Sequence, residues 1–313
     1  MGLGLLISLG SIITLFAIIS PNDLRSAFSV FKPLYIAPFI LIVTVMVVCF
    51  GYRWRILLQS AISLPLAVKA MLINMGTNMV LPARGGDLLR IHYSNVQAKV
   101  PLTFVLGAIL SEKAADLLAI CLIGTLGGLL LGFETNKHRA LIAVAAAAFL
   151  FFLTCVIFVR KRNDSVRRFC LWAFTRLRRE AFFQEHVSPL ISSLGDSLEL
   201  RSFVRTMAIT VVLWLVIYAA AYLCIARLVG VSLSYPEALV LLWASGLGLM
   251  IPAAPSGLGV YHATVVSTFY FLGRPVAEGL VLATALHIGF FVALVAPMGL
   301  IYGKWLFHRS RVG

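Results

Sequence analysis

Long apolar runs separated by short polar segments make up most of this chain. Six runs are long enough to cross about 30 Å of hydrocarbon as helices that rise 1.5 Å per residue. They lie at about 3–20, 34–51, 102–132, 139–159, 207–229 and 277–302. A membrane barrel would instead show segments of about ten residues with alternating polarity. The pattern therefore predicts an all-α polytopic membrane protein with about six full spans.

Two stretches, 57–99 and 235–276, interrupt this pattern and never give twenty consecutive apolar residues. The best run in the first stretch, 61–73, would be only about 20 Å long as a helix. Each stretch therefore predicts a re-entrant helical hairpin with a break at its tip. The break residues are Pro82, Gly85 and Gly86 in the first hairpin, and Pro252, Pro255, Gly257 and Gly259 in the second.

The order of spans and hairpins predicts an inverted repeat within one integral membrane domain, 1–313. Residues 34–132, with hairpin 57–99, would form the first repeat, and residues 207–302, with hairpin 235–276, the second. Interrupted apolar segments at corresponding places in two halves indicate the binding site of a transporter. The alternative is that both breaks are ordinary interfacial loops.

Composition and charge fit a membrane protein and suggest its orientation. The chain has 313 residues, is 61% hydrophobic and carries a formal charge of +14. Residues 160–179 hold eight Lys or Arg against one acid, Asp164, so we expect 160–205 to be a basic amphipathic segment in the cytoplasm. The Arg53 region and both termini would lie on the same side of the cell inner membrane. An anionic lipid surface is the partner that this charge implies, and nucleic acid is excluded because no folded basic domain is present.

Candidate chemistry begins in the polar stretch from Asn78 to Arg90. Arg84, Asp87 and Arg90 follow or flank the glycine pair, so a helix that starts near Asp87 would present Arg90 one turn later. Free backbone N–H groups at such a start, together with Arg84, suit the phosphate of a substrate, and we include Asn78 in the same site. The alternative is a salt-bridged cap that faces the cytosol.

Three further charges, Glu112, Lys113 and Asp116, lie inside the span at 102–132. The two carboxylates are four residues apart and share one helical face. They predict either a structural ion-pair network or ion pairs that exchange partners during transport. His262 and His287 follow the second break and are either ordinary buried histidines or proton-coupling groups.

The sequence lacks nucleotide-binding, zinc-hydrolase and serine-hydrolase motifs, and its five cysteines have no metal-like spacing. We therefore expect no cofactor and no metal, and a transporter rather than an enzyme.

Four blocks in this order resemble the lysylphosphatidylglycerol synthase transmembrane-region family, also called flippase-like. They are Tyr52-Arg53-Trp54-Arg55-Ile56-Leu57-Leu58, Leu81-Pro82-Ala83-Arg84-Gly85-Gly86-Asp87-Leu88-Leu89-Arg90 with Asn78 before it, Ser111-Glu112-Lys113 with Asp116-Leu117-Leu118, and Pro255-Ser256-Gly257-Leu258-Gly259-Val260-Tyr261-His262. The chain departs from many relatives at Lys113, where they carry Arg, and at His262, where they carry Glu. The second departure leaves an acidic role at that position without support.

The resemblance implies an all-helical fold with re-entrant helices and the movement of lipids between leaflets. The best-understood relatives join this region to a soluble aminoacyl transferase domain, whereas this chain ends at Gly313, so we expect a stand-alone member. Two alternatives stay open. One is a non-transporting scaffold for a lipid synthase or glycosyltransferase partner, and the other is an ion-coupled transporter of a small solute.

Overall fold

The computed structural model describes residues 31–81, 85–132, 136–197, 199–250 and 255–309. All regular secondary structure in these residues is helical, which confirms the predicted class. In chain order, the elements are η1 (Pro33–Tyr35), α3 (Ile36–Leu57), α4 (Leu64–Val80), α5 (Gly85–Ala98), α6 (Leu102–Leu130), α7 (Asn136–Lys161), α8 (Asn163–Arg176), α9 (Glu180–Phe182), η2 (Phe183–Val187), α10 (Ser188–Ser197), α11 (Leu200–Val212), η3 (Leu213–Tyr218), α12 (Ala219–Leu228), α13 (Tyr235–Gly248), η4 (Pro255–Gly257), α14 (Val260–Phe271) and α15 (Val276–Arg309).

Five helical segments of the described chain are long and apolar enough to cross a membrane. They are Pro33–Leu57, Leu102–Leu130, Ile142–Lys161, Leu200–Leu228 and Val276–Ile301. The predicted span at 3–20 lies outside the described residues. The helix that contains the predicted span at 207–229 begins at Leu200. Neither Pro nor Gly interrupts the chain there, so 200–205 belongs to the same helix.

The first interrupted stretch forms two antiparallel helices, α4 and α5. Asn74 of α4 bonds Asp87 of α5, and Arg90 further along α5 reaches back to Met71. The two helices have 17 and 14 residues. At 1.5 Å per residue they are about 26 and 21 Å long, which is less than the hydrocarbon thickness.

The second interrupted stretch forms α13 and α14. The two helices pack closely at Gly248, where an added Cβ would overlap the Thr264 hydroxyl. Ser234 caps α13 in a capping box with Glu237. In the turn after α14, Arg274 donates to Glu237 Oε1 at 3.0 Å and to the Ser232 carbonyl at 2.6 Å. The start of α13 and the end of α14 therefore meet at one end of the molecule.

Each helix pair packs against a span from the other half of the chain: α4 lies along α15, and α13 lies along α6. Glycines allow both close approaches. A Cβ on Gly76 would come within 2.7 Å of the Met298 Cβ, and a Cβ on Gly124 within 2.5 Å of the Trp243 ring. The two halves are thus interleaved rather than placed side by side.

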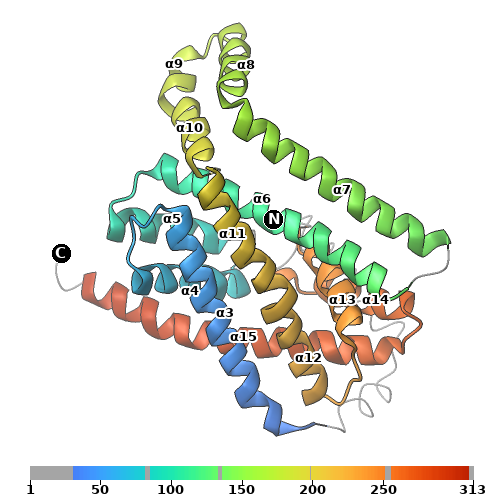
Figure 1. Cartoon of the computed structure of the whole chain (residues 1–313). Coiled ribbons are helices and arrows are strands. Elements are labelled where there is room, and N and C mark those ends of the chain that lie inside the picture. Colours follow the sequence, from blue (N-terminus) through green and yellow to red (C-terminus); the bar gives the residue numbers. More distant parts are fainter. Residues whose placement is uncertain (1–30, 82–84, 133–135, 198, 251–254, 310–313) are drawn as a thin grey trace.

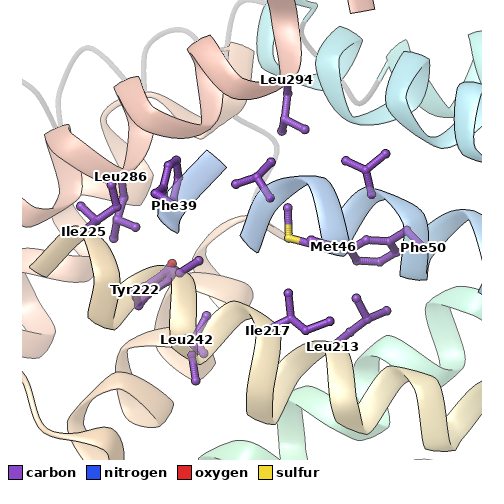
Figure 2. Packing of buried hydrophobic residues seen from close by; sticks show 14 of the residues in the cluster. Phe39, Met46, Phe50, Leu213, Ile217, Tyr222, Ile225, Leu242, Leu286 and Leu294 are labelled. Carbon is purple, nitrogen blue, oxygen red and sulfur yellow. The ribbon is translucent and has the colours of Figure 1, made fainter. Parts of the chain in front are cut away.

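The apolar core lies around α3, whose side chains meet those of η3, α12 and α15 (Figure 2). Phe39, Met46 and Phe50 extend from α3 toward this core. At one end of α3, the Lys32 N–H donates to the Leu228 carbonyl at 2.7 Å. At the other end, Gln59 shares a pocket of about 340 Å³ with Arg160 and Glu199. The ends of α3 and α7 and the start of α11 are therefore neighbours.

The basic segment projects as α8, α9 and α10 from the end of α7 (Figure 1). Its eight basic side chains are all exposed. It is attached to the transmembrane part through α10, which packs on α6, where a Cβ on Gly107 would come within 2.8 Å of the Ser193 Cβ.

Candidate functional site

Six charged side chains from three helices form one network inside the helical bundle. Arg53 comes from α3, Asp87 and Arg90 from α5, and Glu112, Lys113 and Asp116 from α6. The network joins residues that are distant in sequence: Arg53 and Asp116, which pair directly, are 63 residues apart. The network therefore forms only when α5 and α6 have both packed near α3.

Arg53 is fully buried and uses both guanidinium ends. Its Nη1 donates to Asp116 Oδ1 at 2.6 Å and to the Thr210 hydroxyl at 2.9 Å, and its Nη2 donates to Asp116 Oδ2 at 3.2 Å. Glu112 Oε1 lies 3.7 Å from the same Nη2. The paired contacts to Asp116 are the two-pronged arrangement that a planar guanidinium favours with a carboxylate.

Arg90 is also fully buried and connects α5 to α6. Its Nη1 lies 2.7 Å from Glu112 Oε2, and its Nη2 lies 3.1 Å from Asp87 Oδ1. The guanidinium stacks over the Trp54 ring at 4.2 Å from the ring centroid. Trp54 in turn donates to the Ser94 hydroxyl at 3.2 Å, whereas the Arg90 Nε has no hydrogen-bond partner among the described residues.

Lys113 is the loosely bound member. Its Nζ lies 3.6 Å from Asp87 Oδ2 and 3.7 Å from Glu112 Oε1, and its side chain is 39% exposed. Both arginines are 0% exposed and make contacts under 2.8 Å. Lys113 is therefore the cation that can leave the network at the lowest cost.

The three cations and three carboxylates of the network sum to zero charge. Desolvating an ion costs several kcal/mol, which good pairing offsets only when every member has a partner. An unpaired charge at the bilayer centre costs about 2.5–3.5 kcal/mol even on insertion scales. Because the charges balance, all six can lie inside the helical bundle.

The first break is closed by side chains on α4. The Gly86 N–H donates to Asn78 Oδ1 at 2.9 Å. A Cβ on Gly86 would overlap the Asn74 carbonyl, so the start of α5 can approach α4 only with glycine there. Gly85 begins α5, as the prediction of a helix start near Asp87 required.

The second break contains backbone that favours glycine. Gly257 and Gly259 have φ of 68° and 86°, and Ser256 between the helices has φ of 58°. The Ser256 hydroxyl lies 3.2 Å from Met79 Sδ at the end of α4. The tips of the two helix pairs are therefore in contact.

The two histidines lie together just beyond the second break. The rings of His262, on α14, and His287, on α15, are 5.3 Å apart between centroids. His262 is 8% exposed, and its Nδ1 has no hydrogen-bond partner among the described residues. Tyr261 beside it bonds Tyr222, whose hydroxyl also lies 3.0 Å from the Ser245 hydroxyl. This second cluster carries no permanent charge.

Residues 1–299 match the sequence model of the family described as lysylphosphatidylglycerol synthase TM region. The chain belongs to this family. Comparisons with curated proteins and with solved structures gave no match.

In this member of the lysylphosphatidylglycerol synthase TM region family, the sequence located most of the network but not all of its groups. The shared face of Glu112 and Asp116 and the proximity of Arg90 are confirmed. Arg53 and Trp54 are not among the predicted site residues, yet both are 0% exposed, and Arg53 is a member of the network. Their burial depends on α5, α6 and α11, which no pattern near residue 53 reveals.

Three predicted residues, Pro82, Arg84 and Pro252, lie outside the described residues, and the side chain of Pro255 does as well. Beyond Arg53 and Trp54, residues of the segment Leu200–Leu228 that the sequence did not suggest also contact the network. Thr210 accepts from Arg53, and the Trp214 Nε1 donates to Asp116 at 3.3 Å. Both Thr210 and Trp214 lie in the segment Leu200–Leu228, where an isolated Thr or Trp gives no signal of a polar partner.

Proposed function

We propose that this protein is a lipid translocase. It moves an anionic phospholipid, aminoacyl-lipid, glycolipid or polyprenyl-phosphate-type lipid between leaflets, with the headgroup in a polar passage between the two hairpins and the tails in lipid. The observation that supports this most is the charged network, which lies inside apolar helices beside a broken helix and reaches the surface at Lys113. Ionisable groups in such a place usually mark a substrate pathway.

Within this proposal, Lys113 is the group that turns to the lipid phosphate. Asp87 would keep two partners after Lys113 leaves, because Asn74 Nδ2 and Arg90 Nη2 lie 2.7 and 3.1 Å from its Oδ1. Arg84, next to the break in sequence, would supply a second cation. Arg53 and Arg90 bind carboxylates on both sides, so their role is to position Asp87, Glu112 and Asp116.

The packing of the helix pairs supports the inverted repeat on which this passage depends. Two repeats related by a two-fold axis in the membrane plane would place each hairpin against a span of the other repeat. The pairs α4 with α15 and α13 with α6 have this exchanged relation. In this arrangement α4–α5 and α13–α14 enter from opposite sides as re-entrant hairpins, and their tips meet near Met79 and Ser256.

The orientation completes the proposal. Gln59, Arg160 and Glu199 line one pocket, as expected if all three positions face the cytoplasm. The exposed basic side chains of 160–179 belong to that side by the positive-inside rule. Both termini would then be cytoplasmic in a cell inner membrane.

The experiment is a leaflet-sidedness assay in proteoliposomes. Labelled phosphatidylglycerol, polyprenyl phosphate and glycolipid are each followed by chemical quenching of the outer leaflet. We expect wild type to equilibrate at least one anionic lipid faster than empty vesicles, and Lys113→Gln to slow it about tenfold, as loss of one charge-assisted contact of 1.4 kcal/mol would. Lys113→Arg should retain most of the rate.

Lys69→Gln is the matched control, because Lys69 is an exposed lysine in the first turns of α4 outside the network. It should leave the rate unchanged. Equal rates for wild type, Arg84→Ala and empty vesicles with all three lipids would exclude lipid translocation. A substrate-dependent current without lipid movement would instead favour the small-solute transporter, and a stoichiometric synthase or glycosyltransferase partner would favour the scaffold.

A further inference from the structure

The outer face of α8 combines bare aromatic side chains with arginines. Arg168, Trp172 and Arg176 are four residues apart, so they follow one line along the helix, and Phe169 lies beside this line. Phe169 and Trp172 are 67% and 56% exposed. Their rings are 5.9 Å apart, and the Arg176 guanidinium lies 5.4 Å from the Trp172 centroid.

The opposite face of α8 is already used for packing. Phe174 contacts Phe182 and Phe183 of the following turn, with ring centroids 6.1 and 5.7 Å away. Phe183 is 1% exposed. This packing fixes the orientation of α8 about its axis, so the arginine and aromatic face points away from the rest of the protein.

We propose that the outer face of α8, formed by Arg168, Phe169, Trp172 and Arg176, docks onto the anionic surface of the same membrane that the chain spans. Its aromatic rings would lie at the level of the lipid headgroups and its guanidinium groups would contact lipid phosphates. This proposal concerns an attachment surface and is independent of lipid translocation.

The position of α8 directly after a membrane span favours a membrane over a protein as its partner. A single residue, Arg162, separates the span Ile142–Lys161 from α8, which begins at Asn163. The start of α8 is therefore tethered to the membrane at the end of this span. Aromatic and basic side chains on one helical face are the combination that binds an anionic lipid interface.

Charge complementarity supports the same choice. The segment 160–179 has eight exposed basic side chains and a single acidic residue, Asp164. Each Lys or Arg near an anionic leaflet is attracted by the negative surface potential. Leu177, which is 67% exposed in the turn after α8, adds apolar surface at the same end.

The test uses the full-length protein in nanodiscs with lipids brominated on their acyl chains. The signal of Trp172 is the fluorescence of wild type minus that of Trp172→Phe. With brominated phosphatidylglycerol we expect Trp172 to be quenched, and with brominated phosphatidylcholine alone, or in high salt, at least twofold less. The double substitution Arg168→Gln/Arg176→Gln should reduce quenching in phosphatidylglycerol to the same extent.

Arg227→Gln is the matched control, because Arg227 is an exposed arginine in the last turn of α12 and remote from α8. It should leave the quenching of Trp172 unchanged. Two results would overturn the proposal. One is equal quenching of Trp172 in both lipids, and the other is the absence of Trp172 quenching in either lipid, which would leave this face free for a protein partner instead.

Discussion

Arg53 joins α3 to α6 and α11 through buried polar contacts. Its local sequence, an apolar helix that ends in Tyr52-Arg53-Trp54-Arg55, is typical of a span that reaches the membrane interface. In the structure its partners are Asp116 and Thr210, which are 63 and 157 residues away. By contrast, the i, i+4 spacing of Glu112 and Asp116 is local, and the sequence predicted their common face correctly.

Removing Arg53 should therefore be costly. In Arg53→Met, the Trp214 N–H is the one hydrogen-bond donor that Asp116 keeps among the described residues. We expect the free energy of unfolding to fall by about 3–5 kcal/mol, the usual cost of leaving a buried charge without its partner. Unfolding of the purified protein in mixed micelles would measure this change.

The control for this prediction is the double variant Arg53→Met/Asp116→Leu, which removes both charges. Glu112 keeps Arg90 and Lys113, so most of the lost stability should return. If single and double variants were equally destabilised, packing and not charge would explain the role of Arg53.

At the scale of elements, the glycines where α4 packs on α15 and α13 packs on α6 should not tolerate a larger side chain. In Gly76→Ala, the new Cβ would lie 2.7 Å from the Met298 Cβ and 2.9 Å from the Leu294 carbonyl oxygen. Because α15 must then shift, we expect a loss of about 1–3 kcal/mol of stability. Gly299→Ala is the matched control: no atom lies within 4 Å of its added Cβ, so the helix should keep or gain stability.

The cap of α13 should make the second helix pair sensitive to acid. Burial alone would raise the pKa of Glu237, but hydrogen bonds from the Ser234 N–H and hydroxyl and the charge of Arg274 outweigh it and lower the pKa below 4.5. A carboxyl whose folded pKa is lowered stabilises the fold above its unfolded pKa, and this contribution is lost as the pH falls through the folded pKa.

Glu237→Gln tests this contribution by thermal unfolding. At pH 7 the variant should be less stable by about 1 kcal/mol or less, because the pair is partly exposed. Below the folded pKa, wild type and variant should unfold at the same temperature. A difference that persisted in acid would assign the effect to hydrogen bonding instead.

Prediction from sequence succeeded for elements whose signal is local. Long apolar runs located five spans, and the Pro and Gly positions marked the two interruptions, because hydrophobic length and backbone freedom are properties of the segment itself. The helix that contains the predicted span at 207–229 begins earlier, at Leu200, because no helix-breaking residue separates Arg201 and Arg205 from the apolar run. The contact of α4 with α15 gave no signal, since it depends on helices that are more than two hundred residues apart in sequence order.

For the whole molecule, the contact between Met79 and Ser256 should be a point that opens during transport. We expect Met79→Cys/Ser256→Cys, in a background without the five native cysteines, to be joined by a short bifunctional thiol reagent. Joining the tips should stop lipid movement in the proteoliposome assay, and reductive release should restore it. Full activity with the tips joined would show that this contact stays closed throughout the cycle.

The zero net charge of the six-member network has a consequence for the energetics of the proposed lipid transport. Moving one elementary charge through a membrane potential of 100 mV changes the free energy by about 2.3 kcal/mol. The three cations and three carboxylates of α3, α5 and α6, moving together, do no net work against that potential. Any voltage dependence would then be set by the charge of the cargo, so a zwitterionic lipid should distribute without regard to voltage, whereas a singly anionic lipid should accumulate on the positive side.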